Sequence, residues 1–404
     1  MVPTGRPGWK VLGTIVLDTV GQRALLERDR FVDLEVPSYL YTGAHAPALA
    51  SSAERLVEAY SWKSRGPGGR DAMAEAEHDA RVSIAGLLRR PVDEIAFAGD
   101  ASTVWSAIAL GWEWKPGDNV VIHEYEHPAA YAPWLRLVDR GLEVRVVRRR
   151  DDWSMPAEDF AALCDERTTA IVTSHVGYVT GLRYDIAGIA RMADARGIPV
   201  LLDASHSLGV VEVPAELCAL TVSASYKWTL GPYGVGIVAW NRERLPDFVP
   251  GTAGWRSTDD MFAEDRFERW HPASDARRFQ LGASAFAEIA ALGAAVDEIA
   301  ALGLERVERH ALSLGARAIR GLAELGLVVT TPEEDAGRAG NVAFLHPDGE
   351  RFADELDKRG VLLWGGDGRV RASFHVMNSA AHVDHFLEAT AEILAELPVE
   401  GGRA

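Results

Sequence analysis

An aspartate and a lysine stand at the ends of two neighbouring apolar runs, where together they could carry covalent chemistry on a carbonyl. Asp203 ends the run 199–203, Lys227 follows the run 220–224, and a glycine-rich turn at 231–236 comes soon after. In open α/β sheets, ligands bind beyond the carboxyl ends of the strands. A lysine that attacks a carbonyl must lose its proton, which such a pocket favours. A carboxylate in the same pocket can keep a pyridine nitrogen protonated, so that the ring withdraws electrons.

Strands and helices are expected to alternate along the middle of the chain, and this alternation positions the pair. Strands are predicted at 94–97, 119–123, 143–147, 170–174, 199–203, 220–224 and 234–240, and helices at 102–111, 128–141, 156–165 and 186–196. Strands that alternate with helices predict an α/β fold with a mostly parallel sheet covered on both faces.

The segments before this alternation are predicted to be mainly helical. Residues 11–30 are expected to form a helical arm, 51–62 an amphipathic helix and 71–88 another helix. The basic, glycine-rich stretch 63–70 is expected to be a mobile loop, and its use as a lid or an anion contact stays open. Residues 39–47 are predicted to form a short strand that runs into a turn.

The end of the chain is predicted to form a smaller α+β unit. A long helix over 285–325, broken near Gly303, leads into it. The expected division is an N-terminal arm of 1–34, a large domain of 35–290 and a small C-terminal domain of 291–404.

Composition and charge exclude several classes of protein. The 404 residues carry a net charge of −17, which argues against nucleic acid or an anionic membrane as the main partner. No apolar run approaches the ~18 residues of a membrane span, so the cytoplasm is expected. Cys164 and Cys218 have neither CxxC nor metal-ligand spacing, and we expect no disulfide and no metal site.

Around Asp203 and the run Ser225-Tyr226-Lys227 the sequence resembles the class V aminotransferase family, with features of both its cysteine desulfurase and kynureninase branches. The resemblance extends over residues ~35 to 390. It implies a fold-type I enzyme of pyridoxal 5′-phosphate (PLP), with a large domain built on a seven-stranded, mostly parallel sheet. It also implies that Lys227 binds the cofactor's aldehyde and that Asp203 faces the pyridine nitrogen.

Two segments are candidates for holding the cofactor's phosphate. Free amides and a hydroxyl at a helix start can bind phosphate, although a serine there also serves as a plain helix cap. The resemblance favours the phosphate role, with a hydroxyl contact from Ser102 and a backbone contact from Ala101. It also implies that Ser225 and Tyr226 bind the cofactor, with Tyr226 reaching the phosphate.

A later segment, 277–284, resembles the stretch that reaches the phosphate of the partner subunit. The usual threonine is Ala283 here, so the contact is expected from Ser284. The resemblance therefore implies a homodimer with shared active sites.

Three further residues are expected around the cofactor ring. His127, in a Glu-His step, is implied to stack on the ring, and a neutral imidazole there can pass protons. A surface histidine at a helix start is the alternative. His206 is implied to contact the phenolic oxygen, and Tyr178 stands where relatives often carry an asparagine that also binds this oxygen.

The substrate side of the site is expected to include an arginine. Arg371 opens the run Arg-Ala-Ser-Phe, which matches the desulfurase strand that binds the substrate α-carboxylate by a two-pronged contact. His45 and Trp255 are further candidates for the substrate pocket, with plain connection and core roles as the alternatives.

The loop before Arg371 lacks a residue that sulfur transfer requires. Residues 363–369 contain no cysteine to take up a persulfide. The family also contains ergothioneine-type and lincosamide-type C–S lyases. We therefore expect β-elimination from an S-substituted cysteine in specialised metabolism such as antibiotic biosynthesis. Decarboxylation coupled to oxidative deamination, epimerisation and kynureninase-like cleavage stay open as alternatives, as does a PLP-binding regulator.

Overall fold

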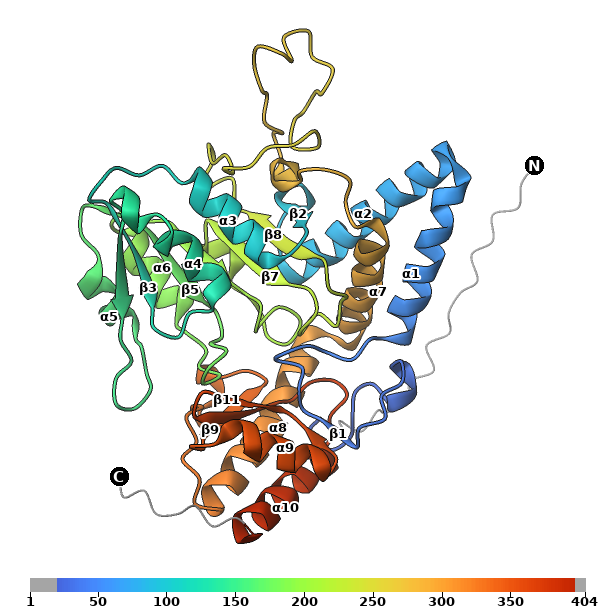
Figure 1. Ribbon diagram of the computed structural model, residues 1–404, viewed down its shortest axis with the longest axis vertical. Coiled ribbons are helices and arrows are strands. Elements are labelled where there is room, and N and C mark those ends of the chain that lie inside the picture. The colour runs from blue at the N-terminus through green and yellow to red at the C-terminus, as the bar shows by residue number, and fades with distance from the viewer. Residues whose placement is uncertain (1–19, 397–404) are drawn as a thin grey trace.

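The computed structural model describes residues 20–396, which form a central sheet covered by helices and a C-terminal layer beside it (Figure 1). In spatial order the sheet contains β2 (Ile95–Ala98), β8 (Gly236–Trp240), β7 (Leu220–Ala224), β6 (Val200–Asp203), β5 (Thr168–Ser174), β3 (Asn119–His123) and β4 (Glu143–Val147). Only β8 runs antiparallel to its neighbours. The predicted α/β class with a seven-stranded, mostly parallel sheet is confirmed.

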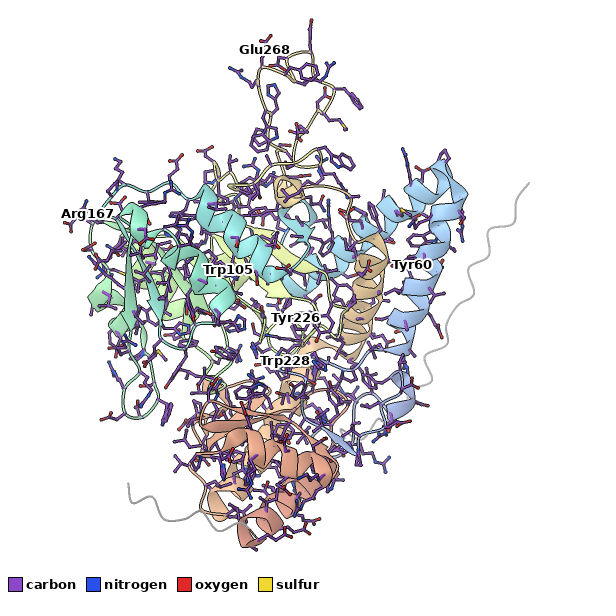
Figure 2. The ribbon with its side chains drawn as sticks, viewed as in Figure 1. Tyr60, Trp105, Arg167, Tyr226, Trp228 and Glu268 are labelled. Atoms are coloured by element: carbon purple, nitrogen blue, oxygen red, sulfur yellow. The ribbon has the colours of Figure 1, made fainter. Side chains whose placement is uncertain are left out.

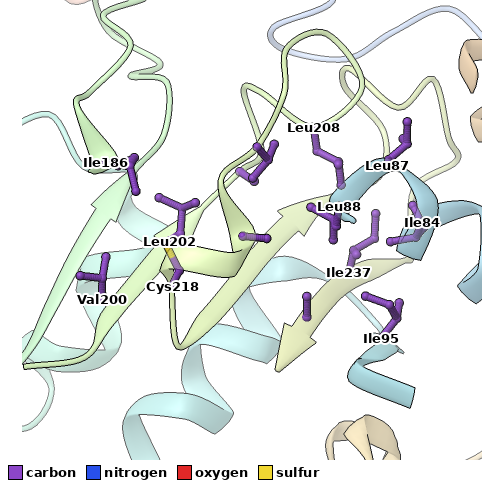
Figure 3. Packing of buried hydrophobic residues seen from close by; sticks show 14 of the residues in the cluster. Ile84, Leu87, Leu88, Ile95, Ile186, Val200, Leu202, Leu208, Cys218 and Ile237 are labelled. Carbon is purple, nitrogen blue, oxygen red and sulfur yellow. The ribbon is translucent and has the colours of Figure 1, made fainter. Parts of the chain in front are cut away.

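Helices cover both faces of the sheet, which explains why its central strands are buried along almost their whole length. The edge strand β4, which starts at the exposed Glu143, is the exception. Leu201 of β6 faces the helices α3 (Ala101–Gly111) and α4 (Pro128–Leu135). Its neighbours Val200 and Leu202 point to the other face, which is covered by α5 (Ala157–Leu163), α6 (Ile186–Asp194) and two further helices (Figure 3).

Three helices pack on one another near β2, at one edge of the sheet. They are α1 (Ala50–Trp62), α2 (Pro67–Leu88) and α7 (Phe286–Leu302). The predicted loop over 63–70 is wrong, because α2 already begins at Pro67. Proline suits the first position of a helix, and Gly66 precedes it with a φ of +58°. Gly69 lies so close to the Trp62 carbonyl that a side chain would not fit there.

The C-terminal layer contains the antiparallel sheet β11-β12-β9 and three helices. The strands are β9 (Asn341–Leu345), β11 (Trp364–Gly366) and β12 (Arg369–Ser373), and the helices are α8 (Leu304–Glu324), α9 (Gly349–Lys358) and α10 (Ala380–Glu396). The predicted break of the long helix is confirmed at Gly303, which has a φ of +81°. β1 (Ser38–Tyr39) pairs with β10 (Val361–Leu362) and so joins this layer. The domain division, whose boundary at 290 falls inside α7, stays a prediction.

The predicted N-terminal helical arm is wrong where the structure describes it, and residues 11–19 lie outside the described part. The amides of Leu25 and Leu26 both donate to the Val376 carbonyl, at 2.7 and 3.0 Å. An amide used in this way cannot make the i→i−4 bond of a helix, so tertiary contacts override the local pattern.

The remaining short elements are 3-10 helices: η1 (Arg28–Arg30), η2 (Lys63–Arg65), η3 (Val92–Glu94), η4 (Val138–Arg140), η5 (Ala215–Leu217), η6 (Ala276–Phe279) and η7 (Asp335–Gly337). Within residues 20–396, none of the helices combines the length and the apolar character that crossing a membrane requires.

Candidate active site

One cavity lies where the carboxyl ends of β6 and β7 meet the start of α3. It offers about 490 Å³ of space between protein atoms, part of it open to solvent. Figure 2 shows Tyr226, from its wall, in the region where the sheet meets the C-terminal layer. Eight residues expected in the site line this cavity: Ala101, Ser102, His127, Tyr178, Asp203, His206, Tyr226 and Lys227.

Lys227 and Asp203 are buried together in this cavity. Burial lowers the pKa of the Lys227 amine to about 8, although the charge of Asp203 opposes the shift. Burial also raises the pKa of the Asp203 carboxyl. One carboxylate oxygen accepts from the Ser205 amide at 2.7 Å and the other from the Trp105 indole at 3.2 Å, which fixes its direction. The site therefore holds an amine that deprotonates easily beside an oriented acid.

The turn after β7 fixes the backbone around Lys227. The Ser225 hydroxyl donates to the Pro232 carbonyl at 2.5 Å, and the Gly231 amide donates back to the Ser225 carbonyl at 2.9 Å. Leu230 adopts a φ of +55°, which a non-glycine residue rarely does. Ser225, which was expected to bind the cofactor, thus closes the turn and does not line the cavity.

A hydrogen-bonded chain links Lys227 to the C-terminal layer. The amine nitrogen lies 3.1 Å from Nε2 of His206, whose Nδ1 lies 2.9 Å from the side-chain nitrogen of Asn341 on β9. The Asn341 amide oxygen accepts from the Ser373 hydroxyl at 2.8 Å, so its NH₂ group faces His206. Because an NH₂ group only donates, Nδ1 accepts and the neutral imidazole carries its proton on Nε2. Burial keeps the pKa of His206 well below its usual value, so the ring stays neutral.

The turn near residue 43 packs directly on this chain. A Cβ atom at Gly43 would come within 2.6 Å of the Ser373 hydroxyl and 2.7 Å of the Asn341 amide oxygen. Only glycine leaves room for the pair. The expected strand and turn at 39–47 therefore support the site from the side of β9 and β12.

His127 and Tyr178 form one wall of the cavity. Their rings meet edge to face with centroids 5.2 Å apart. Nδ1 of His127 accepts from the Ala129 amide at 3.2 Å, which leaves the proton of the neutral ring on Nε2. Burial lowers the pKa of His127 to about 4. The backbone amide of His127 donates to the buried Glu126 carboxylate at 2.7 Å, which holds this segment in place.

The start of α3 faces the same cavity. Asp100 caps the helix by accepting from the Thr103 amide at 2.7 Å, and Ala101 and Ser102 line the cavity next to it. Tyr226, in the turn that follows β7, also lines the cavity, and its ring stacks on that of Tyr233 with centroids 4.3 Å apart. A helix start, a serine and a tyrosine around one end of the cavity form a donor set that suits phosphate.

Arg371 of β12 is buried against the same wall. One of its guanidinium nitrogens donates to the Tyr178 carbonyl at 2.5 Å. Its Nε has no hydrogen-bond partner within the described residues. Burial and the neighbouring Arg369 lower the pKa of Arg371 to about 10, and the group stays charged. A buried cation with an unused donor suits a substrate carboxylate.

Besides Ser225, three expected site residues lie outside the cavity. His45 contacts the rings of Tyr41 and Tyr233 rather than the cavity. Trp255 is 55% exposed. Ser284 accepts from Arg256 at 2.6 Å in a separate hollow behind the α3 turn. Their predicted roles toward the substrate and the partner subunit stay predictions.

Sequence reasoning missed Asn341, Trp105 and Ser205, which bond predicted site residues, and Ser373, which orients Asn341. Asn341 and Ser373 come from strands more than 100 residues after His206 in the sequence. Trp105 and Ser205 could have been suspected from the sequence, because each lies within three residues of a predicted site residue (Ser102 and Asp203). Both cysteines are free thiols away from the cavity, and Cys218 is fully buried.

The family model described as aminotransferase class-V matches residues 39–386. The chain belongs to this family. It is 27% identical over 341 residues to a probable cysteine desulfurase of Pyrococcus abyssi (strain GE5 / Orsay), a match that covers 79% of this chain and 83% of the relative.

Solved structures show the same fold. The apo structure of a cysteine desulfurase from Thermococcus onnurineus NA1 is 25% identical and has a TM-score of 0.81, over 89% of this chain and 95% of that one. A cystine C–S lyase in complex with its product cysteine persulfide is 22% identical, with a TM-score of 0.80 over 88% of this chain and 97% of that one.

This class V enzyme depends on pyridoxal phosphate, and its cavity fits the cofactor. Lys227 would hold the aldehyde carbon, Asp203 the pyridine nitrogen, and Ser102 and Tyr226 the phosphate. When bound, the cofactor withdraws electrons from the substrate's Cα. The chain itself supplies an amine of low pKa, an oriented acid, a neutral imidazole and a buried arginine around that centre.

The low pKa of the Lys227 amine predicts how cofactor loading depends on pH. Only the neutral amine attacks a carbonyl, so the loading rate of the apo protein should fall about tenfold per pH unit below pH 8 and level off above it. The measurement is the rate at which visible absorbance grows after pyridoxal phosphate is added. The same reaction with free lysine serves as the reference for the pH dependence of the cofactor itself. A midpoint near the ordinary lysine value of 10.5 would contradict this expectation.

Asn341→Leu should raise the pH midpoint of cofactor loading. Without the amide donor, His206 is free to carry its proton on Nδ1, and Nε2 then accepts from the ammonium form of Lys227. A gain of about 1 kcal/mol for that bond corresponds to a rise of roughly 0.7 pH units. Asn341→Asp, which only accepts, should raise the midpoint further. An unchanged midpoint in both variants, with unchanged melting temperatures, would show that Asn341 does not set the tautomer.

Proposed function

We propose that this enzyme cleaves the Cβ–S bond of an S-substituted cysteine by β-elimination. One water is consumed overall, and the products are a thiol, pyruvate and ammonia. The desulfurase relatives support a PLP-dependent lyase that acts on cysteine-like amino acids. We extend this proposal to conjugates of specialised metabolism, including antibiotic biosynthesis, and to a cytoplasmic location.

The lack of a thiol near the cavity carries the proposal. The segment that precedes Arg371 in β12 consists of Leu363, β11 and a turn at Asp367, and it has no cysteine to accept sulfur. Cys218 is buried in the core, where its pKa is raised, and Cys164 packs against the same core. Because the chain offers no acceptor, sulfur leaves with its substituent as a small thiol.

The residues around the cavity match the steps of an elimination. Arg371 holds the α-carboxylate and so orients Cα toward Lys227. The neutral Lys227 amine takes the α-proton, for which its pKa of about 8 is suitable. His127 carries a proton on Nε2 and can donate a hydrogen bond from it to the departing sulfur.

We also propose a homodimer. The segment 255–272 projects from the body, with Glu268 at its tip (Figure 2), and Phe262 and Phe267 on it are 77% and 89% exposed. Exposed aromatic residues on a projection indicate a surface that another chain covers. Ser284, expected to serve the partner's site, accepts a hydrogen bond from Arg256 of this segment. Light scattering of the protein and of Phe262→Ser/Phe267→Ser tests this proposal, and a monomeric parent protein would contradict it.

The function is tested by incubating the pure holoenzyme with a panel of cysteine S-conjugates and identifying products by mass. The expected products are the free thiol and pyruvate in equal amounts. Oxygen consumption with an aldehyde product would instead show decarboxylation with oxidative deamination. Loss of optical rotation without a thiol would show epimerisation. Either result would overturn the proposed elimination.

A further inference from the structure

A second arginine lies beside Arg371 and has no role in the steps above. Arg369 is two residues earlier on β12, so both side chains project from the same face of the strand. Both are buried, with 7% of Arg369 and 4% of Arg371 exposed. A buried arginine normally has a carboxylate or several carbonyls around it.

The surroundings of Arg369 leave one edge of its guanidinium unused. The group lies 4.6 Å from the ring centroid of Trp364 and 5.7 Å from that of Tyr178. Nε and Nη2 have no hydrogen-bond partner within residues 20–396. An ion pair with Asp367 involves the other nitrogen, Nη1, at 3.6 Å, and the Asp367 side chain is 77% exposed. Stacking between two rings therefore leaves two buried donors unpaired.

Nε and Nη2 form the side edge of a guanidinium, where two N–H groups point in parallel. This is the edge that a carboxylate binds with both oxygens. Tyr178 connects this edge to the active site, because its ring faces Arg369 while the residue lines the cavity of Lys227. Arg369 does not itself line the cavity, so a ligand that extends from the cavity meets this edge only beyond the Tyr178 ring.

The two positive charges of Arg369 and Arg371 also favour the binding of a second anion. Arg369 and Arg371 both lie near Trp364, at 4.6 and 5.4 Å, and the charge of Arg369 disfavours that of Arg371. The buried acids are already engaged, since Asp203 bonds Trp105 and Ser205 while Glu126 bonds Ser174. One α-carboxylate can neutralise one arginine only.

We propose that Arg369 binds a carboxylate at the far end of the sulfur substituent, so that the substrate is a cysteine conjugate with two carboxylates. This inference rests on the proposed function, of which it names the substrate class. Arg371 takes the carboxylate on Cα, and Arg369 takes the second one in a two-pronged contact beside Tyr178.

A matched pair of conjugates tests the inference in the holoenzyme. S-carboxymethylcysteine and S-carbamoylmethylcysteine have nearly the same shape, but only the first has the second charge. Charged hydrogen bonds in a buried site predict a roughly 10- to 100-fold lower KM for the carboxylate. The half-saturation of the change in visible absorbance on substrate addition should show the same ratio, and this readout does not need turnover.

Variants of Arg369 separate binding from folding. Arg369→Gln should bring the ratio close to one by weakening the carboxylate only, and Arg369→Glu should make S-aminoethylcysteine the preferred conjugate. Arg369→Lys keeps the positive charge but lacks the two parallel N–H groups, so it should give an intermediate ratio of the two KM values. Asp367→Asn is the matched control, which should keep the full preference.

Equal binding of the matched pair by the parent enzyme would overturn the inference, even if both conjugates are cleaved and the proposed function stands. Cleavage of no conjugate would overturn the proposed function, while the half-saturation ratio still decides on Arg369. If Arg369→Gln loses its visible absorbance or melts early, the parent enzyme and Arg369→Lys decide.

Discussion

Lys227→Ala is expected to lower kcat by at least roughly 10³-fold and to remove the visible absorption band of the lysine-bound cofactor. The same amine binds the aldehyde and takes the α-proton, so alanine removes both roles. Within residues 20–396, no other lysine can replace it, because Lys227 is the one lysine that lines the cavity. Borohydride treatment followed by peptide mass mapping should label the Lys227 peptide in the parent enzyme and no peptide in the variant.

Lys115→Ala is the matched control, because Lys115 is exposed in the segment between α3 and β3. Its rate and absorbance should equal those of the parent enzyme. Persistent borohydride labelling in Lys227→Ala would mean that another residue holds the cofactor. Methylamine added to the variant should restore part of the rate if only the amine is missing.

The sequence predicted the centre of the site because local patterns encode it. β6 is apolar until it ends at Asp203, β7 is buried throughout, and the change to the charged residues Asp203 and Lys227 marks the edge of the sheet. Any chain that buries both faces of a parallel sheet must show this change where the strands end. The long-range order of the strands was not needed to bring the two residues together.

Other features depend on contacts between distant segments, which no local pattern contains. Residues 20–30 were expected to be helical, yet Leu25 and Leu26 bond to Val376 from the far end of the chain. Asn341 reaches His206 only because the C-terminal layer packs on the sheet. The spacing of Arg369 and Arg371 was visible in the sequence, but its meaning required the burial of both side chains.

Asp203→Asn should lower kcat by roughly 10²- to 10³-fold while leaving the fold intact. A carboxylate stabilises a protonated pyridine nitrogen, and an amide cannot. Removing one partner of a buried charge pair costs about 3–5 kcal/mol, and the lower part of that range, about 3–4 kcal/mol, corresponds to a loss of this size. The amide is nearly the same size, and its oxygen can still accept from the Ser205 amide, so the melting temperature of the apo protein should change little.

Trp105→Phe tests how much the orientation of the Asp203 carboxylate contributes, as distinct from its charge. This variant keeps the carboxylate but removes the indole donor that lies 3.2 Å from it, so a loss of about tenfold is expected. Cofactor analogues give an independent readout. N-methylated pyridoxal phosphate carries a permanent ring charge. Replacing the ordinary cofactor with it should therefore raise the activity of Asp203→Asn by a larger factor than that of the parent enzyme. If it restores both equally, Asp203 does not act by keeping the ring nitrogen charged.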